Sequence, residues 1–205
     1  MKIAIIGQAA FGEAVFRALL SQGHELVGVS TPTGQPIRID PLREAAQSHG
    51  IPWVPTEGLK DEAFYSRFAS WKPDLGIMAF VTDILPEKAL EEPRLGTIQY
   101  HPSLLPKHRG ASAINWAVVN GESMTGVTIF WPDKGIDTGP ILLQKEVNID
   151  VNDTVWSLYF DKLFPSGLEA LEEAVRLVDG GRAPSIAQDN SQATYEPILK
   201  GEHTA

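Results

Sequence analysis

Apolar and polar positions follow one another along the chain in blocks that predict alternating strands and helices. Continuous apolar runs are typical of strands buried on both faces, whereas apolar residues spaced three and four apart are typical of helices. The blocks that predict strands cover residues 2–7, 25–30, 52–54, 75–79, 96–100, 124–131 and 141–147. The blocks that predict helices lie between Gly12 and Gly23 and over residues 41–48, 61–70, 86–90, 112–120 and 153–179, the last interrupted near Pro165.

This alternation predicts an α/β fold, a mostly parallel twisted sheet with helices on both faces. Ligands of such sheets bind beyond the carboxyl ends of the strands, so the segments after Gly7, Ala79 and Tyr100 are the expected places for a site. The residues after Arg182 are polar and irregular. We therefore expect a catalytic domain over residues 1–182 and a tail or linker over residues 183–205.

Composition excludes several classes of function. The chain has 205 residues, 43% of them apolar, and no cysteine, which excludes a disulfide framework, a cysteine nucleophile and thiolate metal sites. A net charge of -9 disfavours nucleic acid as the main partner. No apolar run is long enough to cross a bilayer, and the N-terminus turns polar too soon for a signal peptide. We expect a cytoplasmic protein with no membrane partner.

The glycines near the N-terminus resemble part of a dinucleotide-binding fingerprint. Gly7 and Gly12 match its first and last glycines, but Ala9 stands where the middle glycine would let the backbone approach a pyrophosphate. The second predicted strand ends in Val29 and Ser30 rather than in an acidic residue. We interpret this segment as a tight strand-to-helix turn.

A histidine follows the strand predicted over residues 96–100. His101 opens a loop that runs to Gly110 and is stiffened by Pro102 and Pro106. A histidine at the ligand-binding edge of a sheet can polarise a carbonyl group or shuttle a proton. A lone histidine more often only binds loop backbone, but this loop has the features of one built to hold a reactive side chain.

A glycine-rich turn joins the last two predicted strands. Within it, Gly135 and Gly139 are expected to take unusual backbone dihedrals, and Asp133 is expected to be structural. Asp137 lies between the two glycines, where backbone can approach a substrate, and can accept a proton if His101 is near. The five histidines show no metal-ligand spacing, and Ser103 lacks the glycine-flanked turn of a serine hydrolase, so we expect neither chemistry.

The two motifs together resemble the signature of folate-dependent formyltransferases: His101 through Pro106 with Arg109 and Gly110, then Asp137 through Gly139. The resemblance covers nearly the whole chain. Within the family it is similar to the N-terminal hydrolase domain of 10-formyltetrahydrofolate dehydrogenase. Further similar segments are Gly7-Gln8, Phe11-Gly12, residues 111–116 and residues 142–146.

The resemblance implies a Rossmann-like formyltransferase fold and 10-formyltetrahydrofolate as the formyl donor, which places the chain in one-carbon metabolism. It implies that His101 and Asp137 form the catalytic pair, so their side chains should meet. It implies a pterin that pairs with backbone of the loop after residue 79. The folate-binding residues so predicted are Phe80, Val81, Thr82, Asp83, Ile84, Leu85 and Ser103.

One residue departs from the pattern. Most transferases of the family have Asn two positions before the histidine, where this chain has Gln99. The amide is the same and the side chain is one methylene longer. Two interpretations stay open: Gln99 donates to the formyl oxygen as a third catalytic residue, or it only fills space.

The formyl acceptor also stays open. We favour an amine, and an aminoacyl group on a carrier protein of a peptide synthetase is one candidate. The alternative acceptor is water, which would make the chain a 10-formyltetrahydrofolate hydrolase. A third alternative is a folate-binding module without catalysis, because a fold alone does not fix a function.

Overall fold

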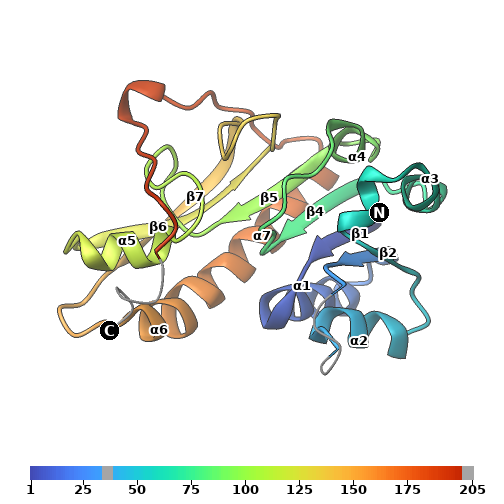
Figure 1. Cartoon of the computed structure of the whole chain (residues 1–205), viewed down its shortest axis with the longest axis horizontal. Helices are drawn as coiled ribbons and strands as arrows, with labels where there is room; N and C mark the ends of the chain where they lie inside the picture. The colour runs from blue at the N-terminus through green and yellow to red at the C-terminus, as the bar shows by residue number, and fades with distance from the viewer. Residues whose placement is uncertain (34–38, 200–205) are drawn as a thin grey trace. The chain divides into compact units, whose positions relative to one another are not determined.

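The structure is a computed structural model that describes residues 1–33 and 39–199 (Figure 1). Seven strands form one sheet in the order β3-β2-β1-β4-β5-β6-β7. The strands are β1 (Lys2–Gly7), β2 (Glu25–Thr31), β3 (Trp53–Pro55), β4 (Leu75–Ala79), β5 (Thr97–His101), β6 (Met124–Phe130) and β7 (Ile141–Asn148). The pairs from β3 to β5 are parallel and β6 with β7 is antiparallel, so the predicted mostly parallel sheet is confirmed.

Helices follow most of the strands. The α-helices are α1 (Ala9–Ser21), α2 (Pro41–Ser48), α3 (Glu62–Ser70), α4 (Glu87–Glu91), α5 (Ala113–Val119), α6 (Val155–Ser157) and α7 (Phe164–Asp179). The other helical turns are the 3-10 turns η1 (Glu57–Lys60) and η3 (Asn190–Gln192) and the π-helical turn η2 (Leu158–Leu163). The chain divides into two compact units, Met1–Gln99 and Tyr100–Ala205.

In the first unit, close packing fixes the turn from β1 into α1. A side chain at Gly7 would overlap the Ala79 carbonyl oxygen of β4, so only glycine fits there. The N–H of Ala9 donates to the Asp40 carboxylate at 2.8 Å, and the same carboxylate accepts from Leu42 N–H and caps α2. The structure shows the tight turn predicted here, and the Asp40 carboxylate occupies one backbone donor at the start of α1 that a nucleotide phosphate would use.

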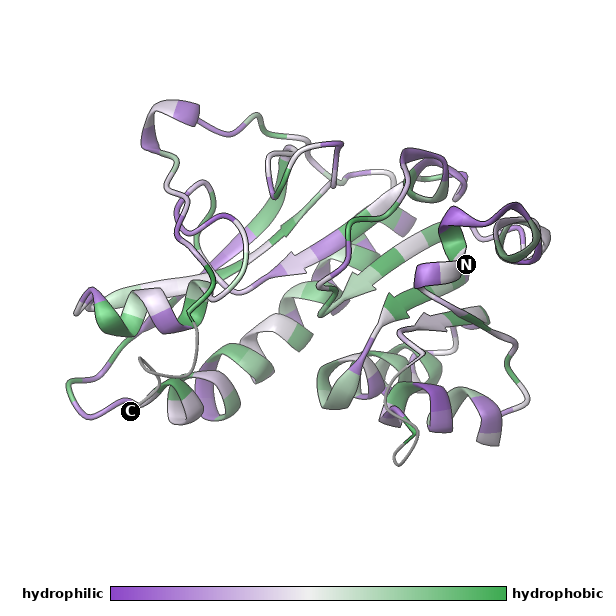
Figure 2. Cartoon of the chain, in the orientation of Figure 1, coloured by the Kyte–Doolittle hydropathy of each residue, from purple (hydrophilic) through white to green (hydrophobic). Residues whose placement is uncertain are grey.

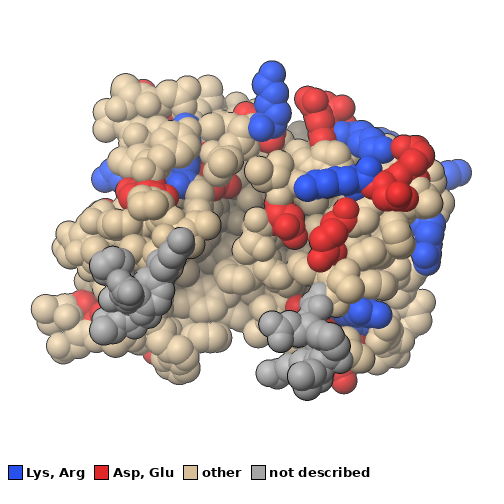
Figure 3. Space-filling view, viewed as in Figure 1, with Lys and Arg blue, Asp and Glu red and all other residues tan. Residues whose placement is uncertain are grey.

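Hydrophobic residues of the first unit gather in its strands, as the green of β1 and β4 in Figure 2 shows. In α1, the buried residues include Phe11, Val15, Phe16 and Leu19. Charged side chains lie over α3 and α4 (Figure 3), where acidic and basic groups alternate. Two of them form the pair Lys88–Glu62 at 2.8 Å, and Arg94 pairs with Asp74 at 3.0 Å. Exposed pairs of this kind contribute at most about 1 kcal/mol each.

In the second unit, the long helix α7 packs against β6 and β7. A side chain at Gly167 would overlap the ring of Tyr100, the residue before His101. The helix predicted over residues 153–179 is divided: a π-helical turn ends at Leu163, and α7 begins at Phe164. Pro165 lies in the first turn of α7, directly after the π-helical turn, and its missing N–H removes one backbone donor at this junction.

Residues 184–199, which we call the strap, are hydrogen-bonded to the rest of the second unit. Ile186 exchanges two backbone hydrogen bonds with Ile141 of β7, at 2.7 and 2.9 Å. Thr194 accepts from Arg109 N–H and donates to the Pro106 carbonyl. The division into a domain over residues 1–182 and a tail over residues 183–205 stays a prediction. The structure adds that the strap is irregular in backbone but held at several points.

Candidate active site

His101 is the last residue of β5 and is only 5% exposed. Its Nε2 lies 2.8 Å from the carbonyl oxygen of His108. A carbonyl oxygen can only accept, so Nε2 carries the proton of this bond. The other ring nitrogen, Nδ1, lies 3.5 Å from Asp137 Oδ2. The structure therefore brings together the two side chains predicted to meet, and leaves Nδ1 as the nitrogen that faces the carboxylate.

The loop from His101 to Gly110 is fixed by buried hydrogen bonds. Ser103 is fully buried, and its hydroxyl donates to the Lys107 carbonyl at 2.6 Å. The Ser103 carbonyl accepts from Thr128 Oγ1 at 2.7 Å, and that oxygen also accepts from Leu105 N–H. The Ser103 hydroxyl thus holds the loop together, and its predicted contact with folate stays a prediction.

Asp137 is held in a strained conformation. Its φ is 53°, the left-handed region that few residues other than glycine adopt. Its Oδ2 accepts from Gly110 N–H at 2.7 Å, which ties the turn to the end of the histidine's loop. Unusual dihedrals were expected at Gly135 and Gly139, and this expectation was wrong. Those glycines are needed for close packing, because a side chain would overlap Thr138 at the first and the Trp131 carbonyl at the second.

The neighbours of His101 have their own partners. Burial raises the pKa of the Tyr100 phenol well above its ordinary value, and the nearby Tyr159 adds to the rise, so Tyr100 stays neutral. His108 is also buried, with Nε2 2.9 Å from Glu122 Oε1 and Nδ1 3.1 Å from Glu196 Oε1. The first contact is a hydrogen bond, whereas the second lies out of line for one.

Gln99 lies two residues before His101 in β5 and is half-buried. Its backbone is opposite Met78 in the parallel pairing with β4. Neither interpretation of its amide is tested by this geometry, and its role as a third catalytic residue stays a prediction.

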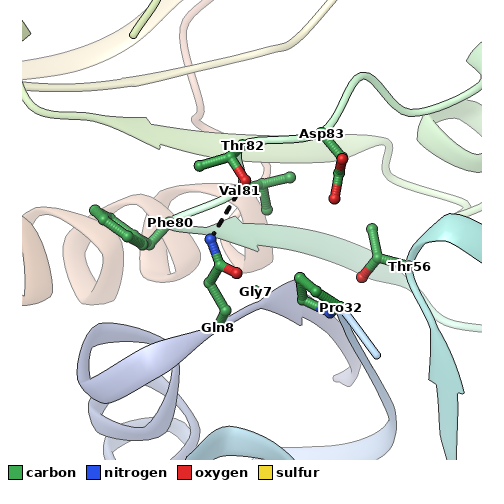
Figure 4. Close-up of a pocket in the computed structure, with 8 residues that line it drawn as sticks. All are labelled: Gly7, Gln8, Pro32, Thr56, Phe80, Val81, Thr82 and Asp83. Atoms are coloured by element: carbon green, nitrogen blue, oxygen red, sulfur yellow. Dashed lines mark hydrogen bonds between the residues drawn. The ribbon is translucent and has the colours of Figure 1, made fainter. Parts of the chain in front are cut away.

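The predicted folate loop, Phe80–Leu85, follows β4 in the first unit. Phe80 has a φ of 62°, and Gln8 Nε2 lies 3.5 Å from Thr82 Oγ1. A depression is lined by Gly7, Gln8, Pro32, Thr56, Phe80, Val81, Thr82 and Asp83, and in Figure 4 Gln8 and Thr82 point toward each other across it. Ile84 is 69% exposed, whereas Leu85 is buried in the core of the unit.

Sequence reasoning missed the residues of the strap that reach the site. Arg109 is buried, and its guanidinium donates to Gln188 Oε1, Asn190 Oδ1 and Tyr195 Oη. Gln188 in turn donates to the carbonyl oxygens of Asp137 and Gly139. The strap has no apolar periodicity, so the one available signal was its run of amide and hydroxyl side chains.

The comparisons with known proteins bear on this geometry. The family model described as "Formyl transferase" matches residues 1–175 of the 205-residue chain. The chain belongs to the formyl transferase family. Within the described ranges, no helix is long and apolar enough to cross a membrane. No group of three or more His, Cys, Asp or Glu side chains arranged to hold a metal ion occurs among residues 1–33 and 39–199.

Curated formyl transferase relatives are similar over nearly the whole chain. It is 43% identical over 208 residues to the cytosolic 10-formyltetrahydrofolate dehydrogenase of Xenopus tropicalis, covering 99% of this chain and 23% of that protein. It is 37% identical over 205 residues to the methionyl-tRNA formyltransferase of Clostridioides difficile, covering 97% of this chain and 66% of that protein. The chain thus spans less than a quarter of the length of such dehydrogenases.

Solved structures of formyl transferases share the fold. The phosphoribosylglycinamide formyltransferase of Anaplasma phagocytophilum superposes with a TM-score of 0.78 at 22% identity, covering 96% of this chain and 99% of that one. An N-formyltransferase of Helicobacter canadensis, solved with folinic acid and dTDP-3-aminofucose, gives 0.75 at 20% identity, covering 96% and 70%. The Rossmann-like formyltransferase fold expected from the sequence is confirmed.

Proposed function

We propose that this chain transfers the formyl group of 10-formyltetrahydrofolate to an acceptor amine, with His101 and Asp137 as the catalytic pair. The observation that carries the proposal is the 3.5 Å approach of His101 Nδ1 to Asp137 Oδ2, with the imidazole fixed from its other side by the His108 carbonyl. Family membership supports the reaction type. The backbone of Phe80–Leu85 is proposed to contact the pterin.

The hydrogen bonds of His101 define its state in the reaction. Because Nε2 already donates to His108, Nδ1 can donate to a formyl oxygen only when the ring carries both protons. In that doubly protonated form, Nδ1 lies 3.5 Å from the Asp137 carboxylate, which would hold the ring in place. His101 would then donate to the oxygen as it gains negative charge, a bond typically worth about 3 kcal/mol at the transition state.

Asp137 handles the proton of the nucleophile. The amine nitrogen bonds to the formyl carbon and becomes positively charged, so it must lose a proton. The Asp137 carboxylate accepts that proton. The C=O bond then re-forms as the bond from the formyl carbon to the folate nitrogen breaks, and that nitrogen takes the proton held by Asp137 as tetrahydrofolate leaves. One proton is lost and one is gained, so the pair returns to its starting state without a metal or redox step.

The proposed reaction is tested by product analysis of the purified chain. It is incubated with 10-formyltetrahydrofolate, with and without amines, including an aminoacyl carrier protein, and tetrahydrofolate, free formate and formylated amine are measured. We expect tetrahydrofolate to appear together with formylated amine. Folate binding without any product would instead favour a non-catalytic folate-binding module.

A substitution tests the base. Asp137→Asn should lower turnover about 10²- to 10⁴-fold, because the general base is lost. Folate affinity should be unchanged, because the asparagine side chain has nearly the same size and shape as that of aspartate. Asp133→Asn is the matched control: Asp133 lies in the same turn, where its carboxylate accepts from Gly135 N–H and Thr138 Oγ1. Normal turnover of Asp137→Asn would show that the base is assigned wrongly.

A hydrolase is the second candidate. The observation that favours it is the 43% identity over 99% of the chain to a protein named 10-formyltetrahydrofolate dehydrogenase, a name that includes no amine acceptor. In that case His101 and Asp137 would act on water instead of an amine. Release of formate at an undiminished rate without any amine, and no competition when amines are added, would favour the hydrolase.

A further inference from the structure

Gln188 is the one half-buried residue of the stretch from Ser185 to Gln192, whose other members are exposed. Its side-chain Nε2 donates to the Asp137 carbonyl at 2.9 Å and to the Gly139 carbonyl at 2.7 Å. Its Oε1 accepts from Arg109, at 3.2 Å from Nε and 2.7 Å from Nη2. A single amide thus bonds both sides of the turn that carries the proposed base.

The chemistry of these partners allows one orientation of the amide. A guanidinium only donates, so the Gln188 oxygen must face Arg109. Backbone carbonyl oxygens only accept, so the Gln188 NH₂ group must face Asp137 and Gly139. The order from Arg109 through Gln188 to Asp137 is therefore fixed by hydrogen-bonding capacity.

Arg109 is a firm anchor for this amide. Its guanidinium is buried, and a buried charge is stable only when its donors are satisfied. Within the described part of the chain it forms no ion pair; its charge is shared by neutral oxygens of Gln188, Asn190 and Tyr195. Turning the Gln188 amide away would leave buried donors of Arg109 without an acceptor.

Asp137 needs support of this kind. A non-glycine residue at a φ of 53° keeps that conformation only when its surroundings enforce it. Gly110 N–H holds the carboxylate, and Gln188 holds the peptide groups of Asp137 and Gly139. Together these bonds set the direction in which the carboxylate faces His101 Nδ1.

We propose that Gln188 is a positioning residue for formyl transfer, acting through Asp137 without touching the substrate. The proposal rests on the proposed function, because it takes Asp137 to be the base. A misplacement of a reacting group by about 1 Å can cost about 100-fold in rate, so the loss of this support should appear in turnover. Folate affinity should not change, because the amide bonds only to the chain.

Gln188→Glu separates the effect of the amide oxygen, which bonds Arg109, from the effect of the NH₂ group, which bonds the turn of Asp137. The carboxylate keeps the bond to Arg109 and adds a charge pair, so the strap should stay attached, but it cannot donate to the two carbonyl groups. We expect kcat for release of tetrahydrofolate to fall about 10- to 100-fold, with the KM for formylated folate within twofold of wild type. Gln188→Met, of similar size and without donors, should show the same loss if the charged variant folds poorly.

Asn190→Ala is the matched control, because Asn190 also accepts from Arg109 but has no bond to the turn of Asp137. It should retain kcat within twofold. Equal losses of kcat in Gln188→Met and Asn190→Ala would show that the strap acts only through general stability and would overturn the proposal. So would a kcat within twofold of wild type in both Gln188 variants.

A double variant tests the route of the effect. If Gln188 acts through Asp137, adding Gln188→Glu to Asp137→Asn should lower the residual rate no further. If the two losses multiply, Gln188 acts by another route and the positioning role is wrong. Failure of the proposed function is distinguishable, because Asp137→Asn alone would then keep normal turnover.

Discussion

The loop after β4 and the loop after β5 differ in how they are held. The loop after β5, residues 101–110, contains four buried polar side chains, His101, Ser103, His108 and Arg109, and all four have bonding partners. In the loop after β4, residues 80–85, Thr82 Oγ1 accepts a long hydrogen bond of 3.5 Å from Gln8 Nε2, and the side chain of Ile84 is exposed to solvent.

The difference corresponds to the two tasks that the formyl-transfer proposal assigns. Groups that move protons must be held within a fraction of an ångström, which requires a shell of buried hydrogen bonds. A loop that contacts a flat ring through its backbone depends on its backbone conformation more than on the positions of its side chains. We therefore expect substitutions after β5 to change rate or folding, and substitutions after β4 to change folate affinity.

The largest effect should come from His101→Asn. We expect turnover to fall about 10²- to 10⁴-fold, because the variant loses the donor to the formyl oxygen and the partner of Asp137. The dissociation constant for tetrahydrofolate, measured by fluorescence titration, should stay within about twofold. His49→Asn, at the exposed end of α2, should leave both quantities unchanged. If folate affinity and turnover fall together, His101 is a binding residue and the comparison of the loops fails.

A smaller effect, on stability, is expected from His108→Asn. Asn tolerates the φ of 56° at this position, so the change removes the imidazole between Glu122 and Glu196 with little backbone strain. Loss of the buried partner should lower the free energy of unfolding by about 1–3 kcal/mol, measured by urea denaturation. Glu122→Gln, which keeps an acceptor for His108, should cost less. An unchanged urea midpoint for His108→Asn would show that the contacts of His108 with Glu122 and Glu196 do not stabilise the loop.

The sheet was predictable because its strands are marked by composition. The run at residues 2–7 is apolar after Lys2, and the run at residues 75–79 is apolar throughout; in the structure β1 and β4 occupy those ranges with nearly every residue buried. The pair of His101 and Asp137 came from family motifs rather than from spacing. Its 36-residue separation carries no local signal, so composition and periodicity alone would not have joined it.

The strap and the helix division were not predictable in the same way. Gln188 and Tyr195 bond to Arg109 from an exposed, irregular segment, and such polar contacts leave no periodic pattern in the sequence. The π-helical turn Leu158–Leu163 lies inside a run predicted as one helical region, and helix propensity does not distinguish π-helical from α-helical turns.

The smallest effect, and the sharpest test of the loop after β4, is Ile84→Ala. Ile84 is 69% exposed, so its truncation should change the free energy of unfolding by less than about 0.5 kcal/mol. If folate covers about 40 Å² of its side chain, the lost burial amounts to about 1 kcal/mol, or about a fivefold weaker tetrahydrofolate affinity. Ile198→Ala in the strap is the matched control, since Ile198 is 68% exposed. Titration of both variants beside wild type decides the point: equal affinities in all three would mean that the exposed isoleucine after β4 does not face the folate.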